Sequence, residues 1–211
     1  MFEADITEEA VTYARSVLAR HNFGRRGVAD GTVDQQLTGL VGEIVVQDLF
    51  DYPRARGQTS PDGGVDLVFH GITIDVKTMR RDAPVRRHYV NNFSGLQADT
   101  SARAFIFCSL NWSRRVLTVC GWTLKDLFFR IADFHPRGAL RPRADGTSFP
   151  AEADLYEIKN QDLYNPRTIR ELHDDLLVIS IAEGRCSCQS CGRDSGRAPR
   201  ETALDLPILS H

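Results

Sequence analysis

The sequence predicts an α/β fold in which a mixed central β-sheet is flanked by helices. Three observations support this prediction. The first fifty residues carry helix-capping signals and apolar side chains at helical spacing, residues 64–77 alternate polar and apolar side chains as a hairpin does, and residues 104–122 contain two apolar runs of strand length. Helices and strands in this order bury their apolar surfaces when the helices pack on one sheet.

The chain has the size and composition of a globular domain. Its 211 residues are enough for a substantial core, and 42% hydrophobic with 26% charged residues is an ordinary balance. We expect a single domain over residues 1–183 and a cysteine-containing C-terminal tail over residues 184–211. The acidic start does not resemble a signal peptide, and no apolar run approaches the length of a membrane span. We therefore expect a cytoplasmic protein with no membrane partner.

Two helices are predicted before the hairpin. Residues 5–8 have the form of a capping box and predict a helix to about residue 19, and residues 32–35 predict a second helix to about residue 50. Glu43 lies off the apolar stripe of this second helix. Gly39 and Gly42 lie next to it, and each costs about 1 kcal/mol of helix stability relative to alanine. These glycines predict that the helix closely approaches the edge of the sheet.

Residues 64–77 predict two short antiparallel strands joined by a tight turn. Gly71 supplies the positive φ that such a turn needs, so we expect His70 and Gly71 at its centre. This pairing places Asp66 directly opposite Asp75 on one face. The other face is wholly apolar and consists of Val65, Leu67, Phe69, Ile72, Ile74 and Val76.

The opposed carboxylates are the first indication of chemistry. Directly opposed side chains have Cβ atoms about 4.5–5.5 Å apart, and like charges there are destabilising. A divalent cation between Asp66 and Asp75 would reverse this effect, because Mg²⁺ takes carboxylate oxygens as ligands and leaves positions for water and phosphate. Lys77 lies on the same face, and the chain's other lysines are Lys125 and Lys159. The alternative is a solvated outer face with a chance ion pair between Asp75 and Lys77.

Asp66 followed by Asp75-Val76-Lys77 on a hairpin resembles the active-site signature of the PD-(D/E)xK nuclease superfamily. That family has a restriction-endonuclease-like core and carries a further acidic residue on a helix before the hairpin. Glu43 is similar to this helix glutamate. The matched region is about a fifth of the chain, and its value lies in the combination of helix, hairpin, opposed carboxylates and lysine.

The resemblance implies a Mg²⁺-dependent DNA endonuclease, with Mn²⁺ as a substitute, that hydrolyses phosphodiester bonds. It implies that Glu43, Asp66, Asp75 and Lys77 are catalytic. Asp66, Asp75 and the carbonyl group of Val76 would hold the metal, and Glu43 would bind a second ion or orient water. Lys77 would help activate the attacking water or stabilise charge on the phosphate. We expect a restriction- or phage-type enzyme that acts as a homodimer, because two chains with one site each can cut both strands.

Two other matches to the signature are weaker. Glu157-Ile158-Lys159 is a second (D/E)xK tripeptide, for which the sequence shows no paired acidic strand. Asp62 follows Pro61 and copies the "PD" of the family name, but it falls outside the inferred pairing. We prefer Asp66, with Asp62 as the fallback.

The segment after the hairpin is the densest basic stretch of the chain. Basic residues near an aromatic side chain suit contact with a phosphate backbone. A solvated charged loop is the alternative, and a net charge of −2 does not by itself indicate a nucleic-acid binder. The candidate DNA-binding residues are Arg80, Arg81, Arg86, Arg87 and His88.

The tail contains a local cluster of cysteines. Cys188 and Cys191 have the spacing of a zinc knuckle, and Cys186 lies nearby. Structural Zn²⁺ needs four ligands, so the fourth would come from elsewhere, for example His173. Free thiols in the tail are the alternative.

The later elements carry no diagnostic residues. We expect central strands at residues 104–110 and 115–122, a helix over residues 123–132, an exposed loop over residues 135–150 and an edge strand at residues 156–158. Asn165 and Pro166 predict a helix start.

Three functional alternatives remain open beside the endonuclease. They are a non-catalytic DNA-binding module of the same fold, a structure-specific nuclease of the junction-resolvase or repair type, and a zinc-dependent binding protein. A catalytic protein requires that Glu43, Asp66, Asp75 and Lys77 converge on one point.

Overall fold

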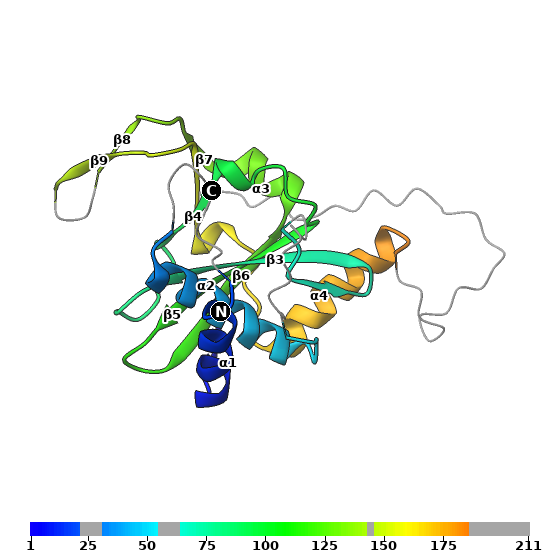
Figure 1. Cartoon of the computed structure of the whole chain (residues 1–211). Helices are drawn as coiled ribbons and strands as arrows, with labels where there is room; N and C mark the ends of the chain where they lie inside the picture. Colours follow the sequence, from blue (N-terminus) through cyan, green and yellow to red (C-terminus); the bar gives the residue numbers. More distant parts are fainter. Residues whose placement is uncertain (22–30, 55–63, 143–145, 186–211) are drawn as a thin grey trace.

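The structure is a computed structural model that describes residues 1–21, 31–54, 64–142 and 146–185. In this part of the chain a curled mixed sheet is surrounded by four α-helices, which confirms a mixed α/β fold (Figure 1). The sheet runs in the order β1-β6-β5-β3-β2, with β3 and β5 parallel and the other neighbours antiparallel. Its strands are β1 (Phe2–Asp5), β2 (Leu67–Phe69), β3 (Ile72–Arg80), β5 (Ala104–Asn111) and β6 (Val116–Leu124).

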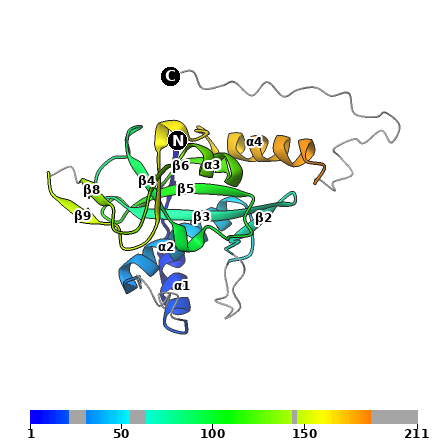
Figure 2. The same cartoon turned by 90° about the horizontal axis from the view of Figure 1, so that it is seen from above.

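The helices lie on both sides of this sheet. Figure 2 shows α1 and α2 below it and α3 and α4 above it. Their bounds are α1 Glu8–Leu18, α2 Val33–Leu49, α3 Lys125–Ile131 and α4 Ile169–Ala182. No helix in the described residues is long and apolar enough to span a membrane.

The capping prediction is confirmed for α2 and corrected for α1. Thr32 and Gln35 exchange both hydrogen bonds of a capping box at the start of α2. In α1 the cap is Thr7, whose side chain accepts a hydrogen bond from the backbone N–H of Ala10 at 3.1 Å. The residues before Ile6 form the edge strand β1 because they pair with β6, so a helix that begins with a capping box at residues 5–8 was a wrong prediction.

The hairpin prediction is confirmed. His70 and Gly71 have φ values of 46° and 81°, which a tight turn between two antiparallel strands requires. Leu67 pairs with Ile74 and Phe69 with Ile72, in the expected register. The inward face of the hairpin joins a core that also includes α1 and α2, while β5 is buried along its whole length.

A second, smaller sheet packs beside the first. It consists of β4 (Val90–Ser94), β10 (Leu155–Lys159) and β7 (Asp133–His135), with β10 in the middle. The strand expected at the edge is therefore central in this sheet. Two 3₁₀ turns, Gly95–Gln97 and Asn160–Asp162, follow β4 and β10. Aromatic rings from both sheets and α3 form a separate core between them.

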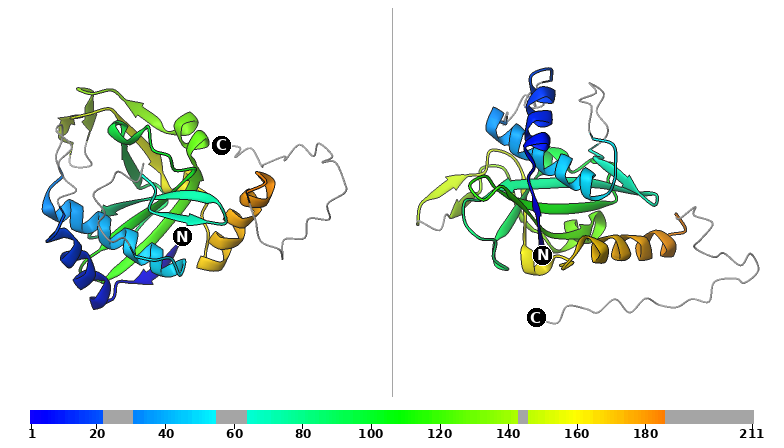
Figure 3. Two further views of the ribbon diagram at one scale, coloured as in Figure 1. Left: turned by 45° about the vertical axis from the view of Figure 1, so that its right-hand side comes forward. Right: turned by 90° about the horizontal axis from the view of Figure 1, so that it is seen from below.

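Other expectations for the second half of the chain need correction. The expected loop at residues 135–150 contains two paired strands, β8 (Leu140–Pro142) and β9 (Ser148–Pro150), which project from the body as an arm (Figures 1 and 3). Helix α4 starts after Thr168, whose hydroxyl caps the N–H of Glu171, and not at Asn165. Helix α3 is present, but Leu124 precedes it without a side-chain cap.

Candidate functional site

Asp75 and Lys77 lie on one face of β3 and form an ion pair. Lys77 Nζ is 2.6 Å from Asp75 Oδ1, and Asp75 is 2% exposed. The ammonium group also lies 5.4 Å from the centre of the Phe93 ring, which belongs to the aromatic core. The alternative of a solvated outer face therefore does not hold at Asp75, because the carboxylate is buried with its lysine partner.

Asp66 lies just before β2 and is bonded to β3. Its backbone N–H donates to the carbonyl of Ile74 at 2.8 Å. Its Oδ2 accepts a hydrogen bond from the backbone N–H of Val76 at 2.6 Å. The regular pairing of β2 begins at Leu67, so Asp66 lies just outside the ladder and is bonded to β3 through both its backbone and its side chain.

Helix α2 positions Glu43 near Asp66. A buried side chain, Gln47, donates from Nε2 to Glu43 Oε1 and to the backbone carbonyl of Asp66, both at 2.9 Å. Gly42 permits this approach, because a Cβ at that position would lie 2.0 Å from Thr78 Oγ1 on β3. The predicted close approach is thus confirmed at Gly42. It is wrong at Gly39, where a Cβ would meet nothing within 4 Å.

The charges of Glu43, Asp75 and Lys77 all influence the titration of Asp66. Burial raises the pKa of Asp66 well above its usual value, and the negative charges of Glu43 and Asp75 raise it further. The charge of Lys77 and the Val76 hydrogen bond oppose this shift. Glu43, Asp75 and Lys77 therefore all act on Asp66, although Glu43 lies on α2 and the other two lie on β3.

The loop before the hairpin packs closely beside Asp75. Gly64 has a φ of 75°, and a Cβ there would lie 2.5 Å from Thr100 Oγ1 and 3.7 Å from Asp75 Oδ2. Thr100 Oγ1 donates to the Gly64 carbonyl at 2.9 Å. Asp62 lies just outside the described residues, so the fallback assignment is untested.

The site has the donor chemistry of a hard cation. Asp66, Asp75 and Glu43 supply carboxylate oxygens, and Val76 supplies a carbonyl group on the same strand as Asp75. When ionised, the three carboxylates carry more negative charge than one lysine can neutralise. A divalent ion would balance the remainder. Among the described residues, however, no group of three or more His, Cys, Asp or Glu side chains is already arranged around a common metal position.

The predicted DNA-binding residues differ in their surroundings. Arg86, Arg87 and His88 are exposed in the loop between β3 and β4. Arg80 is half-exposed and pairs with Asp34 at 2.9 Å. Arg81 points inward: its guanidinium donates to Ser109 Oγ at 3.1 Å and to the Val90 carbonyl, and it lies 5.0 Å from the centre of the Tyr89 ring.

The second (D/E)xK tripeptide has an opposed acidic residue after all. Glu157 on β10 pairs directly with Asp133 on β7. The sequence did not reveal this pair, because no strand was expected between the helix over residues 123–132 and the loop over residues 135–150. Glu157 is buried, and Arg141 from the arm forms an ion pair with it; His135 Nε2 lies 3.6 Å from Glu157 Oε2. The arginine neutralises Glu157, so this cluster is a weaker metal candidate than the cluster around Asp66.

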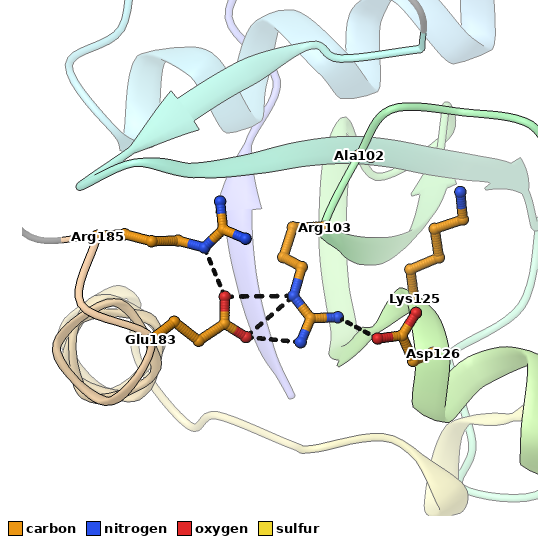
Figure 4. A pocket seen from close by; sticks show the side chains of 6 residues that line it. All are labelled: Ala102, Arg103, Lys125, Asp126, Glu183 and Arg185. Atoms are coloured by element: carbon orange, nitrogen blue, oxygen red, sulfur yellow. Dashed lines mark hydrogen bonds and ion pairs between the residues drawn. The ribbon is translucent and has the colours of Figure 1, made fainter.

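A pocket of about 510 Å³ lies near the start of β5 (Figure 4). Four of its charged groups are paired with one another: Arg103 bonds Glu183 at 2.6 Å and Asp126 at 2.7 Å, and Arg185 bonds Glu183 at 2.6 Å. The ammonium group of Lys125, which also lines the pocket, donates to the carbonyl of Thr100. Because these side chains already have partners within the protein, the pocket is a weak candidate for a charged ligand. The expected zinc ligands Cys186, Cys188 and Cys191 lie outside the described residues.

One residue of the site was missed by sequence reasoning. This residue is Gln47, and its spacing of one helical turn from Glu43 is the signal that could have identified it. Comparisons of the chain with models of known protein families, with curated proteins and with solved structures find no match. The residues of the site are therefore what any functional assignment depends on.

Proposed function

We propose that this protein is a Mg²⁺-dependent endodeoxyribonuclease with a restriction-endonuclease-like core. The observation that carries the proposal is that Glu43, Asp66, Asp75 and Lys77 act on one another at the point where α2 meets the hairpin. A group of like charges that is removed in part from water is costly to a protein that has no use for it. Phosphodiester hydrolysis by a bound divalent ion gives these residue types a use.

Each side chain has a role that its position supports. Asp66, Asp75 and the carbonyl of Val76 would hold Mg²⁺ or Mn²⁺, and Glu43 would bind a second ion or orient water. When bound, the ion supplies a Lewis acid for the phosphate oxygen and lowers the pKa of a bound water. Lys77, fixed by Asp75 at 2.6 Å, would hold its ammonium group toward the attacking water or the phosphate.

DNA binding is proposed through the exposed side chains of Arg86, Arg87 and His88, with Arg80 available if its pair with Asp34 opens. Arg81 is a weaker candidate because its bonds hold it against β4 and β5. A homodimer of restriction or phage type, located in the cytoplasm, is the arrangement that we propose for cutting both strands.

The test is plasmid cleavage with Mg²⁺, with Mn²⁺ and with EDTA. The protein is compared with Lys77→Ala and with Lys159→Ala, which removes the lysine of the second (D/E)xK tripeptide. We expect metal-dependent nicking or linearisation that falls about 100-fold or more in Lys77→Ala and persists in Lys159→Ala. Discrete bands would indicate a restriction-type enzyme.

Other results would redirect the proposal. Loss of cleavage in Lys159→Ala alone would move the active site to the cluster around Glu157. Cleavage of junctions or damaged DNA but not of plain duplex would favour a structure-specific nuclease. Binding of DNA without cleavage of any substrate would overturn the catalytic proposal and leave a DNA-binding module.

A further inference from the structure

Gln47 joins the two halves of the candidate site. Gln47 is 1% exposed. Its Nε2 donates to Glu43 Oε1 and to the Asp66 carbonyl at 2.9 Å each. One amide nitrogen thus connects α2 with the residue that precedes β2. Both of its N–H groups are used within the site, so this amide contributes to more than the packing of the helix.

The hydrogen bond from Gln47 to Glu43 opposes the repulsion between Glu43 and Asp66. Glu43 and Asp66 are both acidic and repel each other, and a glutamate on a helix can rotate away to relieve the repulsion. A hydrogen bond from an N–H to an ionised carboxylate is stronger than one between neutral groups. It therefore favours the rotamer that keeps Glu43 beside Asp66.

An amide suits this position better than a cation. Lysine or arginine would also bond Glu43, but its positive charge would cancel the negative charge that attracts a divalent ion. Gln47 supplies two donors and leaves the charge of the carboxylates unchanged.

We propose that Gln47 is a positioning residue that keeps Glu43 and Asp66 within reach of the same divalent cation. This inference rests on the proposed nuclease function, and it assigns to Gln47 no contact with substrate. Partners that orient metal-binding carboxylates typically contribute about 10–100-fold to metal affinity or activity.

The test uses Gln47→Met, which keeps the length of the side chain and removes the donors. Gln36→Met on the same helix is the matched control, because the Nε2 of Gln36 donates at 3.0 Å to the carbonyl of Gly31, which precedes the helix. Mn²⁺ binding is measured by calorimetry without DNA, and plasmid cleavage is measured across a range of Mn²⁺ concentrations. Gln47→Asn, whose amide is one methylene shorter, provides a second variant if Gln47→Met does not fold.

We expect Gln47→Met to lose about 10–100-fold in Mn²⁺ affinity. Cleavage at low Mn²⁺ should fall by a similar factor, the KM for DNA should stay unchanged, and excess Mn²⁺ should restore kcat. Gln36→Met should behave as the parent, and Gln47→Asn should fall between the two.

Unchanged Mn²⁺ affinity in both Gln47 variants would overturn the positioning role, even if cleavage dropped, and the proposed function would stand on the activity of the parent. A parent protein that neither binds Mn²⁺ nor cleaves DNA would overturn the proposed function and the positioning role together.

Discussion

The ionised form of Asp66 has unfavourable surroundings when no cation is bound. It is an acidic side chain whose ionised form is opposed by burial and by two neighbouring carboxylates, and favoured by Lys77 and the N–H of Val76. Because the pKa of Asp66 is raised in the folded protein, folding favours its protonated form. This effect stabilises the protein at low pH and is lost as the pH rises through the raised pKa.

Replacing Asp66 with asparagine should therefore stabilise the metal-free protein at neutral pH. Asparagine retains an oxygen for the Val76 N–H and removes a negative charge from the cluster. We expect a gain of about 1–4 kcal/mol, the range that Coulomb's law gives for like charges about 4 Å apart between aqueous and protein-surface dielectric constants. Denaturant unfolding in EDTA from pH 5 to 8 measures it, and the parent should lose stability with rising pH relative to the variant.

Asp174→Asn is the control for this comparison, because Asp174 is exposed on α4. It should follow the pH dependence of the parent. A loss of stability in Asp66→Asn at neutral pH in EDTA would contradict the clustered arrangement of the carboxylates. Added Mn²⁺ should stabilise the parent more than Asp66→Asn, because the cation binds the negative charge of Asp66 and the variant lacks that charge.

At the scale of elements, the contact between α2 and β3 decides whether Glu43 reaches the hairpin. Gly42 lies against Thr78 with no room for a Cβ, whereas Gly39, one turn earlier, faces open space. The sequence pattern predicts a close approach at both glycines. Only the packed structure distinguishes the glycine that is needed for contact from the one that is not.

Alanine substitutions should separate the two glycines. Gly42→Ala should destabilise the protein by about 1–3 kcal/mol, because the added methyl group must displace α2 from β3. Gly39→Ala should be neutral or stabilising by up to about 1 kcal/mol, because it only improves helix propensity. Thermal unfolding in EDTA compares the two variants, and equal effects would contradict the predicted difference. Gly42→Ala should also weaken Mn²⁺ binding because it moves Glu43.

At the scale of the whole molecule, Arg103 forms ion pairs with residues that are far apart in sequence. It precedes β5 and forms ion pairs with Asp126 on α3 and with Glu183 at the end of α4 (Figure 4). The hydrogen bond from Arg103 is the main cause that lowers the pKa of Glu183. The resulting stability is present above the ordinary pKa of a glutamate and is lost as the pH falls through the lowered pKa.

Arg103→Met should loosen α4 without unfolding the central sheet. Hydrogen exchange should become faster in the last turns of α4, while β5 and β6 keep their protection. Acidification of the parent through the lowered pKa of Glu183 should produce the same local change. Arg170→Met is the matched control, because Arg170 is exposed on α4 and pairs only at 3.8 Å with Asp174. Equal exchange in both variants would show that Arg103 does not anchor the helix.

Local signals explain which elements were predicted correctly. The Thr32–Gln35 capping box and the His70–Gly71 turn depend on neighbours within a few residues, so the sequence contains all the information that determines them. The strands β5 and β6 were predicted from their apolar runs for the same reason. The short strands β1 and β7 were missed, because they exist only by pairing with β6 and β10.

The sequence by itself determined the α/β class, the register of the hairpin and the candidate residues Asp66, Asp75, Lys77 and Glu43. It could do so because alternation, turn chemistry and capping are short-range effects. The tertiary structure alone decided that α2 approaches β3 at Gly42, that Gln47 bonds both Glu43 and Asp66, and that Arg81 turns inward while Glu157 is neutralised by Arg141. These outcomes depend on distances between elements that are remote in the chain. Such distances are set by packing and by the cost of burying charge. Neither can be read from a local sequence pattern.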